Sequence, residues 1–416
     1  MADGSAEQSP TRESRTICLS ITEEHYCRIV NDPVRFRDWL MECFAASPEL
    51  FPEEFDGRFQ MKDVYVSKKT GLSVRRIKLP DGSFYRVRPC FLMPYMMGRA
   101  AEVEHALFLR KFAVPFWALT RVFGRNSMFW FRLECSLGRN SIVGTTVRQT
   151  NIPQHLLADE HHQTRDGQKV FIATTVGGGC CLGAELAESA GTDDLTAAYG
   201  VFRDEARDVE PDYTPETVNT DGWKATRAAW PLLFPTIVLL RCFLHAWLKI
   251  RDRAKNLKDL YFELSTHVWE AYHAPDKRSL SQRLRRLRAW AGEHLGGVVL
   301  KEVEDLCDKK AFWLQTHDHP EGHRTSNALD RVMRPMNRYF FDCQHLHGRR
   351  RATRAHVRGW ALLWNFTPWN PATTKTNNGW NSPAERLNQH RYHDNWLENL
   401  MISASLGGHR KTPQKQ

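Results

Sequence analysis

The sequence predicts an α/β protein: a mixed sheet flanked by helices, interrupted by an all-helical insertion and preceded by an α+β module and a helix-turn-helix module. Two observations predict this class. Short β-branched runs alternate with amphipathic stretches between residues 154 and 254, whereas only helical apolar spacing follows between 255 and 320. A chain of 416 residues, 42% of them hydrophobic, is long enough for two or three domains.

The N-terminal part predicts a leader and a small module. Residues 1–16 are polar and lack an apolar signal segment, so we expect a disordered leader. Residues 17–90 predict the α+β module, with helical spacing from 23 to 46. Strands are expected at 62–66, 73–79 and 83–89.

Residues 91–150 predict short helices joined by turns that contain glycine, at 100–112, 115–123 and 127–137. Basic side chains are interleaved with them, and this is typical of a helix-turn-helix that contacts DNA. The candidate DNA-binding side chains here are Arg125, Arg132 and Arg139. Any small helical bundle gives the same pattern, so that alternative stays open.

Residues 151–254 predict three strands, then helix, strand, helix, strand and helix. The strands are expected at 154–158, 169–176, 180–186, 217–220 and 236–240, and the helices at 192–206, 223–230 and 242–253. This is the order of a ribonuclease-H-like core. Residues 255–320 then form the helical insertion, and residues 321–365 complete the core, beginning with a helix at 325–345.

Three acidic residues have the placement expected of a metal-dependent nuclease. Asp159 and Asp221 each follow a strand, and Asp330 lies about one turn into a helix. Three convergent carboxylates can hold two divalent cations, which cut and rejoin phosphodiester bonds. Each residue also has an ordinary interpretation: Asp221 as a turn or cap residue, and Asp330 as an ion-pair partner of Arg334. Glu160 is the alternative to Asp159, because neighbours on a strand point to opposite faces.

Cys242 and His245 lie one helical turn apart, after the last strand. They lack an obvious second pair of zinc ligands, so we expect His245 to be hydrogen-bonded near the carboxylates. The ten cysteines show no disulfide framework and predict reduced thiols in the cytosol. No apolar run is long enough for a membrane span.

The charge is concentrated near the C-terminus. Residues 331–416 carry 14 Lys and Arg against 4 Asp and Glu, which equals the net charge of +10 for the whole chain. This surplus suits a phosphate backbone, although a solvated basic surface gives the same composition. Residues 366–416 form its basic, Trp- and Asn-rich end. The candidate DNA-binding side chains are Arg331, Arg334, Arg349, Arg350 and Arg351, with Arg354 and Arg358 in the same cluster.

Three stretches resemble one family: Thr217–Trp223 (TVNTDGW), Cys242–His245 (CFLH) and Ser326–Arg331 (SNALDR). They resemble insertion-sequence transposases of the DDE or DDD type, in the style of the Mutator-like enzymes. The resemblance covers about residues 150–365. One departure is that the third acid is Asp where many relatives have Glu.

The resemblance implies a DNA transposase with a ribonuclease-H-like core. It implies that Asp159, Asp221 and Asp330 are catalytic and bind Mg²⁺, or Mn²⁺ as a substitute, with Cys242, His245 and Asn327 as supporting residues. The implied partners are double-stranded DNA, as element ends and as target, and further copies of the chain, in the nucleoid-associated cytoplasm of a prokaryotic cell, with no membrane. The alternatives are a catalytically silent DNA-binding relative and a ribonuclease-H-like nuclease.

Overall fold

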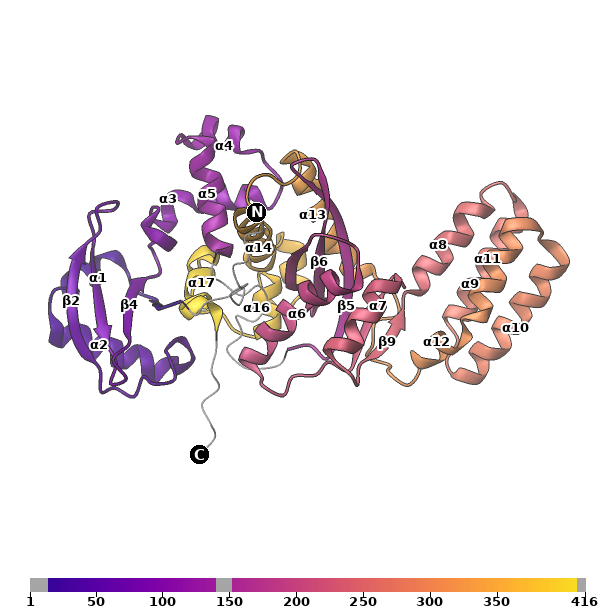
Figure 1. Cartoon of the computed structure of the whole chain (residues 1–416), viewed down its shortest axis with the longest axis horizontal. Helices are drawn as coiled ribbons and strands as arrows, with labels where there is room; N and C mark the ends of the chain where they lie inside the picture. Colours follow the sequence, from indigo (N-terminus) through magenta and orange to yellow (C-terminus); the bar gives the residue numbers. More distant parts are fainter. Residues whose placement is uncertain (1–13, 140–151, 410–416) are drawn as a thin grey trace, which may run out of the picture.

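The computed structural model of the chain describes residues 14–139 and 152–409 (Figure 1). It is a mixed α/β protein with two mixed sheets. The N-terminal sheet lies at one end of the molecule in Figure 1, the second sheet lies near the middle, and a helical bundle lies at the other end. Most of the expected leader and the end of the helix-turn-helix region lie outside the described residues.

The N-terminal sheet has the order β1-β4-β3-β2, with β1 parallel to β4 and the other pairs antiparallel. Its strands are β1 (Thr16–Leu19), β2 (Gln60–Val66), β3 (Ser73–Lys78) and β4 (Phe84–Pro89). Strand β1 was not expected from the sequence. Two helices, α1 (Glu23–Ile29) and α2 (Pro33–Ala46), replace the single helix expected over 23–46. The break occurs because proline at position 33 has no backbone N–H to donate to a carbonyl of the preceding turn. Asp32 caps the start of the new helix α2.

The three short helices after this module agree with the sequence prediction. They are α3 (Ala100–Arg110), α4 (Phe116–Phe123) and α5 (Ser127–Gly138). Helix α5 packs closely against α14 (Arg350–Phe366) because both have glycine at the crossing. A Cβ atom on Gly138 would lie 2.3 Å from the Gly359 nitrogen, so neither helix tolerates a side chain there.

The central sheet has the order β7-β6-β5-β8-β9. Its strands are β5 (His155–Arg165), β6 (Gln168–Gly177), β7 (Cys180–Ala187), β8 (Thr217–Thr220) and β9 (Val238–Arg241). Strands β5, β6 and β7 pair in antiparallel fashion, whereas β8 and β9 run parallel to β5. The short strands β8 and β9 therefore begin and end on the same sides of the sheet.

Helices cover both faces of this sheet and make it a three-layer unit (Figure 1). Helices α6 (Thr192–Val209) and α7 (Lys224–Leu233) bury one face. Helices α13 (Asn327–Asp342) and α14 bury the other. Side chains alternate between the layers along each strand, so Leu156 lies under α6 and α7 while Leu157 lies in the α13 layer.

The residues between β9 and α13 are helical, as expected. They form α8 (Phe243–Ala254), α9 (Asp259–Tyr272), α10 (Lys277–His294), α11 (Gly297–Asp308) and α12 (Lys310–Gln315). Helix α8 leads out of the sheet into this bundle, which has its own apolar core. Lys309 separates α11 from α12.

The C-terminal residues do not form a separate region. They contain α15 (Pro371–Thr376), α16 (Pro383–Asn388) and α17 (Trp396–Ser403). Leu397, Leu400 and Met401 of α17 are buried in the same apolar core as β1 and α3. Helix α17 therefore completes the apolar core of the N-terminal module. No helix in the described part of the chain is long and apolar enough to cross a membrane.

Candidate catalytic site

Asp159 lies within β5 and not at its end. The strand continues to Arg165 because its antiparallel pairing with β6 extends that far, so the expectation of a strand end at Asp159 is wrong. The parallel pairing with β8, however, ends at Leu157 opposite Asn219. Asp159 is two residues further on and shares the face of Leu157, which is the face covered by α13.

Asp221 directly follows β8, as the sequence predicted. It comes two residues after Asn219, and therefore lies next to Asp159 across the two parallel strands. Its Oδ1 accepts a hydrogen bond of 2.7 Å from the N–H of Trp223, so Asp221 also has the turn role that was the alternative interpretation. Gly222 has φ +97°, which allows the chain to turn here from β8 into α7.

The two carboxylates interact electrostatically. Burial raises the pKa of Asp159 to about 7, and the negative charges of Asp221 and Glu160 contribute to the same shift. Asp159 and Asp221 thus bring two acidic groups together, and the nearby charge of His245 opposes the shift only in part. A bound cation would compensate the remaining charge, and the oxygen ligands fit Mg²⁺ or Mn²⁺.

Glu160 points to the opposite layer. Its Oε1 accepts hydrogen bonds from the hydroxyls of Tyr199, at 2.7 Å, and Thr226, at 2.6 Å, beneath α6 and α7. These contacts give Glu160 a structural role between the sheet and its helices. Asp159 is therefore the member of the pair that faces Asp221.

Asp330 lies in the first turn of α13, where the sequence predicted a helix. Its Oδ2 accepts a hydrogen bond of 3.1 Å from the hydroxyl of Ser326, and no ion pair with Arg334 occurs among the described residues. The N–H of Ser326 in turn donates to Cys242 Sγ at 3.2 Å. The start of α13 is thereby attached to the start of α8. Asn327, the first residue of α13, is exposed.

Cys242 and His245 link the start of α13 to the carboxylates of Asp159 and Asp221. Burial raises the pKa of the Cys242 thiol, but hydrogen bonds with His245 and Ser326 outweigh burial, and the pKa is lowered overall. The hydrogen bond with Cys242 raises the pKa of His245 to about 9, and the charges of Asp159 and Asp221 act in the same direction. The imidazole is therefore protonated at neutral pH, and its Nδ1 is buried without a hydrogen-bond partner among the described residues.

The three predicted acids do not form a complete ligand set in this structure. Within residues 14–139 and 152–409, no three His, Cys, Asp or Glu side chains are grouped so that they could hold a metal ion. Asp159 and Asp221 are brought together. Asp330 is connected to them indirectly: it is hydrogen-bonded to Ser326, Ser326 to Cys242 and Cys242 to His245, whose charge interacts with the two carboxylates.

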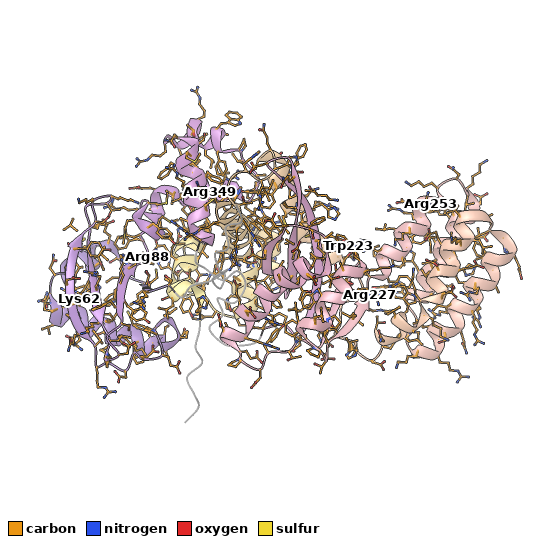
Figure 2. All side chains as sticks on the ribbon, viewed as in Figure 1. Lys62, Arg88, Trp223, Arg227, Arg253 and Arg349 are labelled. Atoms are coloured by element: carbon orange, nitrogen blue, oxygen red, sulfur yellow. The ribbon has the colours of Figure 1, made fainter. Side chains whose placement is uncertain are left out.

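A cleft opens beside Asp221, between the ends of β8 and β9 and the helical insertion. Arg241 at the end of β9 and His245 and Lys249 of α8 line one side of it. The cationic Lys309 and the acidic Glu302 and Asp305 of the insertion line the other side. Trp223 and Arg227, labelled in Figure 2, lie on the part of the core that faces the bundle. Arg241 and Lys249 were not singled out in the sequence. The sequence signal that could have identified Arg241 was its position at the end of the last strand. In the structure it pairs with Thr220, one residue before Asp221.

Most of the predicted DNA-binding arginines are exposed. The exposed side chains are Arg125, Arg132, Arg139, Arg331, Arg334, Arg349, Arg350 and Arg351. Arg350 is also within 3.5 Å of Glu188, so part of its charge is compensated within the protein.

Two further members of the arginine cluster pair with carboxylates within the protein. Arg358 is 3% exposed and pairs with Glu205 and Glu185, and Arg354 pairs with Glu185 at 2.7 Å. The inclusion of Arg358 in a DNA-binding cluster was wrong, because α14 turns it toward β7 and α6, whereas Arg354, 24% exposed, has part of its charge compensated by Glu185. The basic surplus of residues 331–416 therefore overstates the positive charge available on the surface.

Comparison with known proteins adds no family assignment: the sequence matches no protein-family model and no curated protein.

Proposed function

We propose that the chain is a DNA transposase, which cleaves a strand at the ends of a mobile element and joins the freed end to target DNA. The observation that carries the proposal is the pair Asp159 and Asp221, side by side on neighbouring parallel strands. Two adjacent carboxylates, of which Asp159 has a raised pKa, beside a cleft that contains cationic side chains, are suited to a metal-dependent reaction on a phosphodiester.

The fold supports a ribonuclease-H-like core. Three antiparallel strands are followed by two parallel ones, and helices lie on both faces. This agrees with the order that the sequence predicted for such a core. Helix α13, which carries Asp330, lies on the same face as Asp159. The helices between β9 and α13 would then be an insertion ahead of the third acid.

In this proposal Asp159 and Asp221 are the first ligands of Mg²⁺ or Mn²⁺, and Asp330 joins them when DNA and metal are bound. The metal ions, when bound, activate the attacking oxygen and stabilise the leaving oxygen of the phosphodiester. The chain itself supplies Arg241 and Lys249, which would contact the phosphate. His245, protonated at neutral pH, offsets the charge of the two carboxylates.

The proposed partner is double-stranded DNA, and the proposed active form is a homo-oligomer assembled on the element ends in the nucleoid of a prokaryotic cell. The exposed arginines of α5 and of the start of α14 support DNA binding. Arg132 and Arg351, for example, have no carboxylate partner among the described residues. Cations of this kind bind phosphates by releasing counterions.

The test is a cleavage assay with the full chain. The substrate is supercoiled plasmid that carries the DNA flanking the reading frame, incubated with Mg²⁺, Mn²⁺ or a chelator. We expect metal-dependent nicking, and products in which the freed end is joined to other DNA. Asp221→Asn should abolish both while DNA binding is retained, whereas Asp212→Asn, an exposed change in the same domain, should abolish neither. Metal-dependent cleavage by the Asp221→Asn protein would refute the assignment.

The same assay separates the two alternatives. A ribonuclease-H-like nuclease would cleave without joining DNA ends. A catalytically silent DNA-binding protein would bind without cleaving, and the absence of a complete three-ligand group among the described residues is the observation in its favour.

A further inference from the structure

A second pocket lies where the N-terminal module, α5 and the start of α14 meet, and it shares no lining residue with the cleft beside Asp221. Its volume is about 600 Å³, which is in the range of small-molecule and cofactor sites. Arg349, labelled in Figure 2, belongs to it. Neither the proposed cleavage reaction nor its metal ligands use this pocket.

The rim of the pocket is strongly basic. Arg132 and Arg139 come from α5, Arg349 and Arg351 from the start of α14, and Lys69 from the turn between β2 and β3. No acidic side chain lines the pocket, and the four arginines have no carboxylate partner among the described residues. Five cationic groups from three separate elements therefore face one opening, which favours an anionic ligand with more than one charge.

The floor of the pocket is apolar. Tyr95, Met97, Met128 and Phe131 line it together with Cys135. Met128 is 51% exposed and Tyr95 is 37% exposed, so these large side chains are accessible from solvent. An aromatic and thioether surface of this kind suits a flat, uncharged ring.

The backbone beside the floor is strained. Tyr95 and its neighbour Met96 have φ values of 58° and 54°, which residues with a Cβ rarely adopt. The conformation is held by Lys69 Nζ, which donates to the Tyr95 carbonyl at 3.3 Å, and by the bond from the Met96 N–H to the Met93 carbonyl. Strain of this kind is concentrated at binding sites, where it fixes a side chain for its ligand.

From the basic rim and the apolar floor together, we infer that this pocket binds a single unpaired nucleotide of a DNA strand. The base lies against Met128 and Phe131, while its own and the adjacent phosphates contact the arginines of the rim. The Arg139 guanidinium lies over the Tyr95 ring, 5.0 Å from its centroid, and holds that side chain at the edge of the floor. The inference rests on the proposed DNA-binding function and specifies a substrate feature: an unpaired base close to the duplex that α5 and α14 contact. Extruding a base is least costly where it is already unpaired or mismatched.

The test compares two short duplexes that differ in one group. One has a single unpaired thymidine in the middle, and the other has an abasic residue at the same position, so that the phosphates are identical. Binding to the full chain is measured by fluorescence anisotropy in the presence of a chelator. Because stacking of a base on an aromatic side chain is the expected difference, the wild-type protein should bind the thymidine duplex roughly tenfold more tightly.

Two substitutions fill the pocket without changing its charge. Ala352→Trp and Met128→Trp both replace exposed lining residues, and each should remove the preference for the thymidine duplex while affinity for a fully paired duplex stays the same. Ala372→Trp, on exposed α15, is the matched control and should keep the preference. Arg351→Gln should weaken the binding of all three duplexes, and Arg278→Gln, at an exposed position of the insertion, should not.

Equal binding of the thymidine and abasic duplexes by the wild-type protein would overturn the inference, since the rim would then contact phosphates alone. A preference that persists in both Trp variants would also overturn it. The assay needs no metal and no cleavage. A protein that shows the preference but never cleaves DNA would refute the transposase proposal and support nucleotide binding in the pocket. A protein that cleaves DNA without the preference would support the transposase proposal and refute nucleotide binding in the pocket.

Discussion

Replacing Asp221 by Asn tests the electrostatic basis of the candidate site independently of any DNA substrate. Asn keeps an Oδ1 acceptor for the Trp223 N–H, so the turn between β8 and α7 is preserved. The substitution removes one negative charge beside Asp159. The pKa of Asp159 should therefore fall from about 7 toward its ordinary value of 3.8.

The sign of the effect on stability follows from this shift. A carboxyl group whose pKa is raised in the folded protein destabilises the folded state when it ionises, so the free energy of unfolding falls as the pH rises from about 4 to about 7. A pKa of about 7 instead of 3.8 corresponds to a loss of about 3 kcal/mol between pH 5 and pH 8. Burial is the largest cause of the raised pKa and Asp221 the second. We therefore expect the loss to be about 1 kcal/mol smaller in the Asp221→Asn protein.

The measurement is urea unfolding followed by tryptophan fluorescence, at pH 5 and pH 8, with a chelator present. Asp212→Asn serves as the control, because it removes the same charge from the surface of the same domain. Mg²⁺ added at pH 8 should stabilise the wild-type and control proteins, and it should not stabilise the Asp221→Asn protein. An identical loss of stability between the two pH values in all three proteins would show that Asp221 does not influence Asp159, and would remove the main support for the site.

Three further predictions concern the arginines and the packing of α14. Replacing Arg349 and Arg351 together by Ala should weaken binding to every DNA sequence and reduce the slope of log affinity against log salt by about 0.9 per phosphate contact removed; an unchanged slope in a salt titration would assign these side chains to solubility. Arg358→Met removes the guanidinium that pairs with buried Glu205 and shares Glu185 with Arg354, and should destabilise the protein by about 3–5 kcal/mol in urea unfolding; a variant as stable as wild type would contradict the ion pairs. Gly359→Ala would bring a Cβ atom to 2.6 Å from a carbonyl oxygen of α5 and should cost about 1–3 kcal/mol, measured in the same way; a variant as stable as wild type would contradict the close packing of α5 on α14.

The sequence by itself determined the element order of the central sheet. The hairpin of β6 and β7, the strand end before Asp221 and the helix that carries Asp330 all follow from local features, because apolar period, glycine turns and capping residues act over a few residues. Local features also failed in informative places. The break between α1 and α2 at Pro33 is itself a local signal, which the helical apolar spacing over 23–46 obscured. The extent of β5 beyond Asp159, by contrast, depends on a partner strand and not on its own apolar residues.

Only the tertiary structure decided which distant residues meet. From composition, all the C-terminal arginines were expected to contact DNA. Packing gives them different roles: Arg358 is buried against Glu205, and Arg349 is exposed at the rim of the pocket. The pairing register of β5 and β8 sets Asp159 beside Asp221, although 61 residues separate them in the chain. Register and helix docking depend on contacts between segments that are remote in sequence, and no local pattern specifies them.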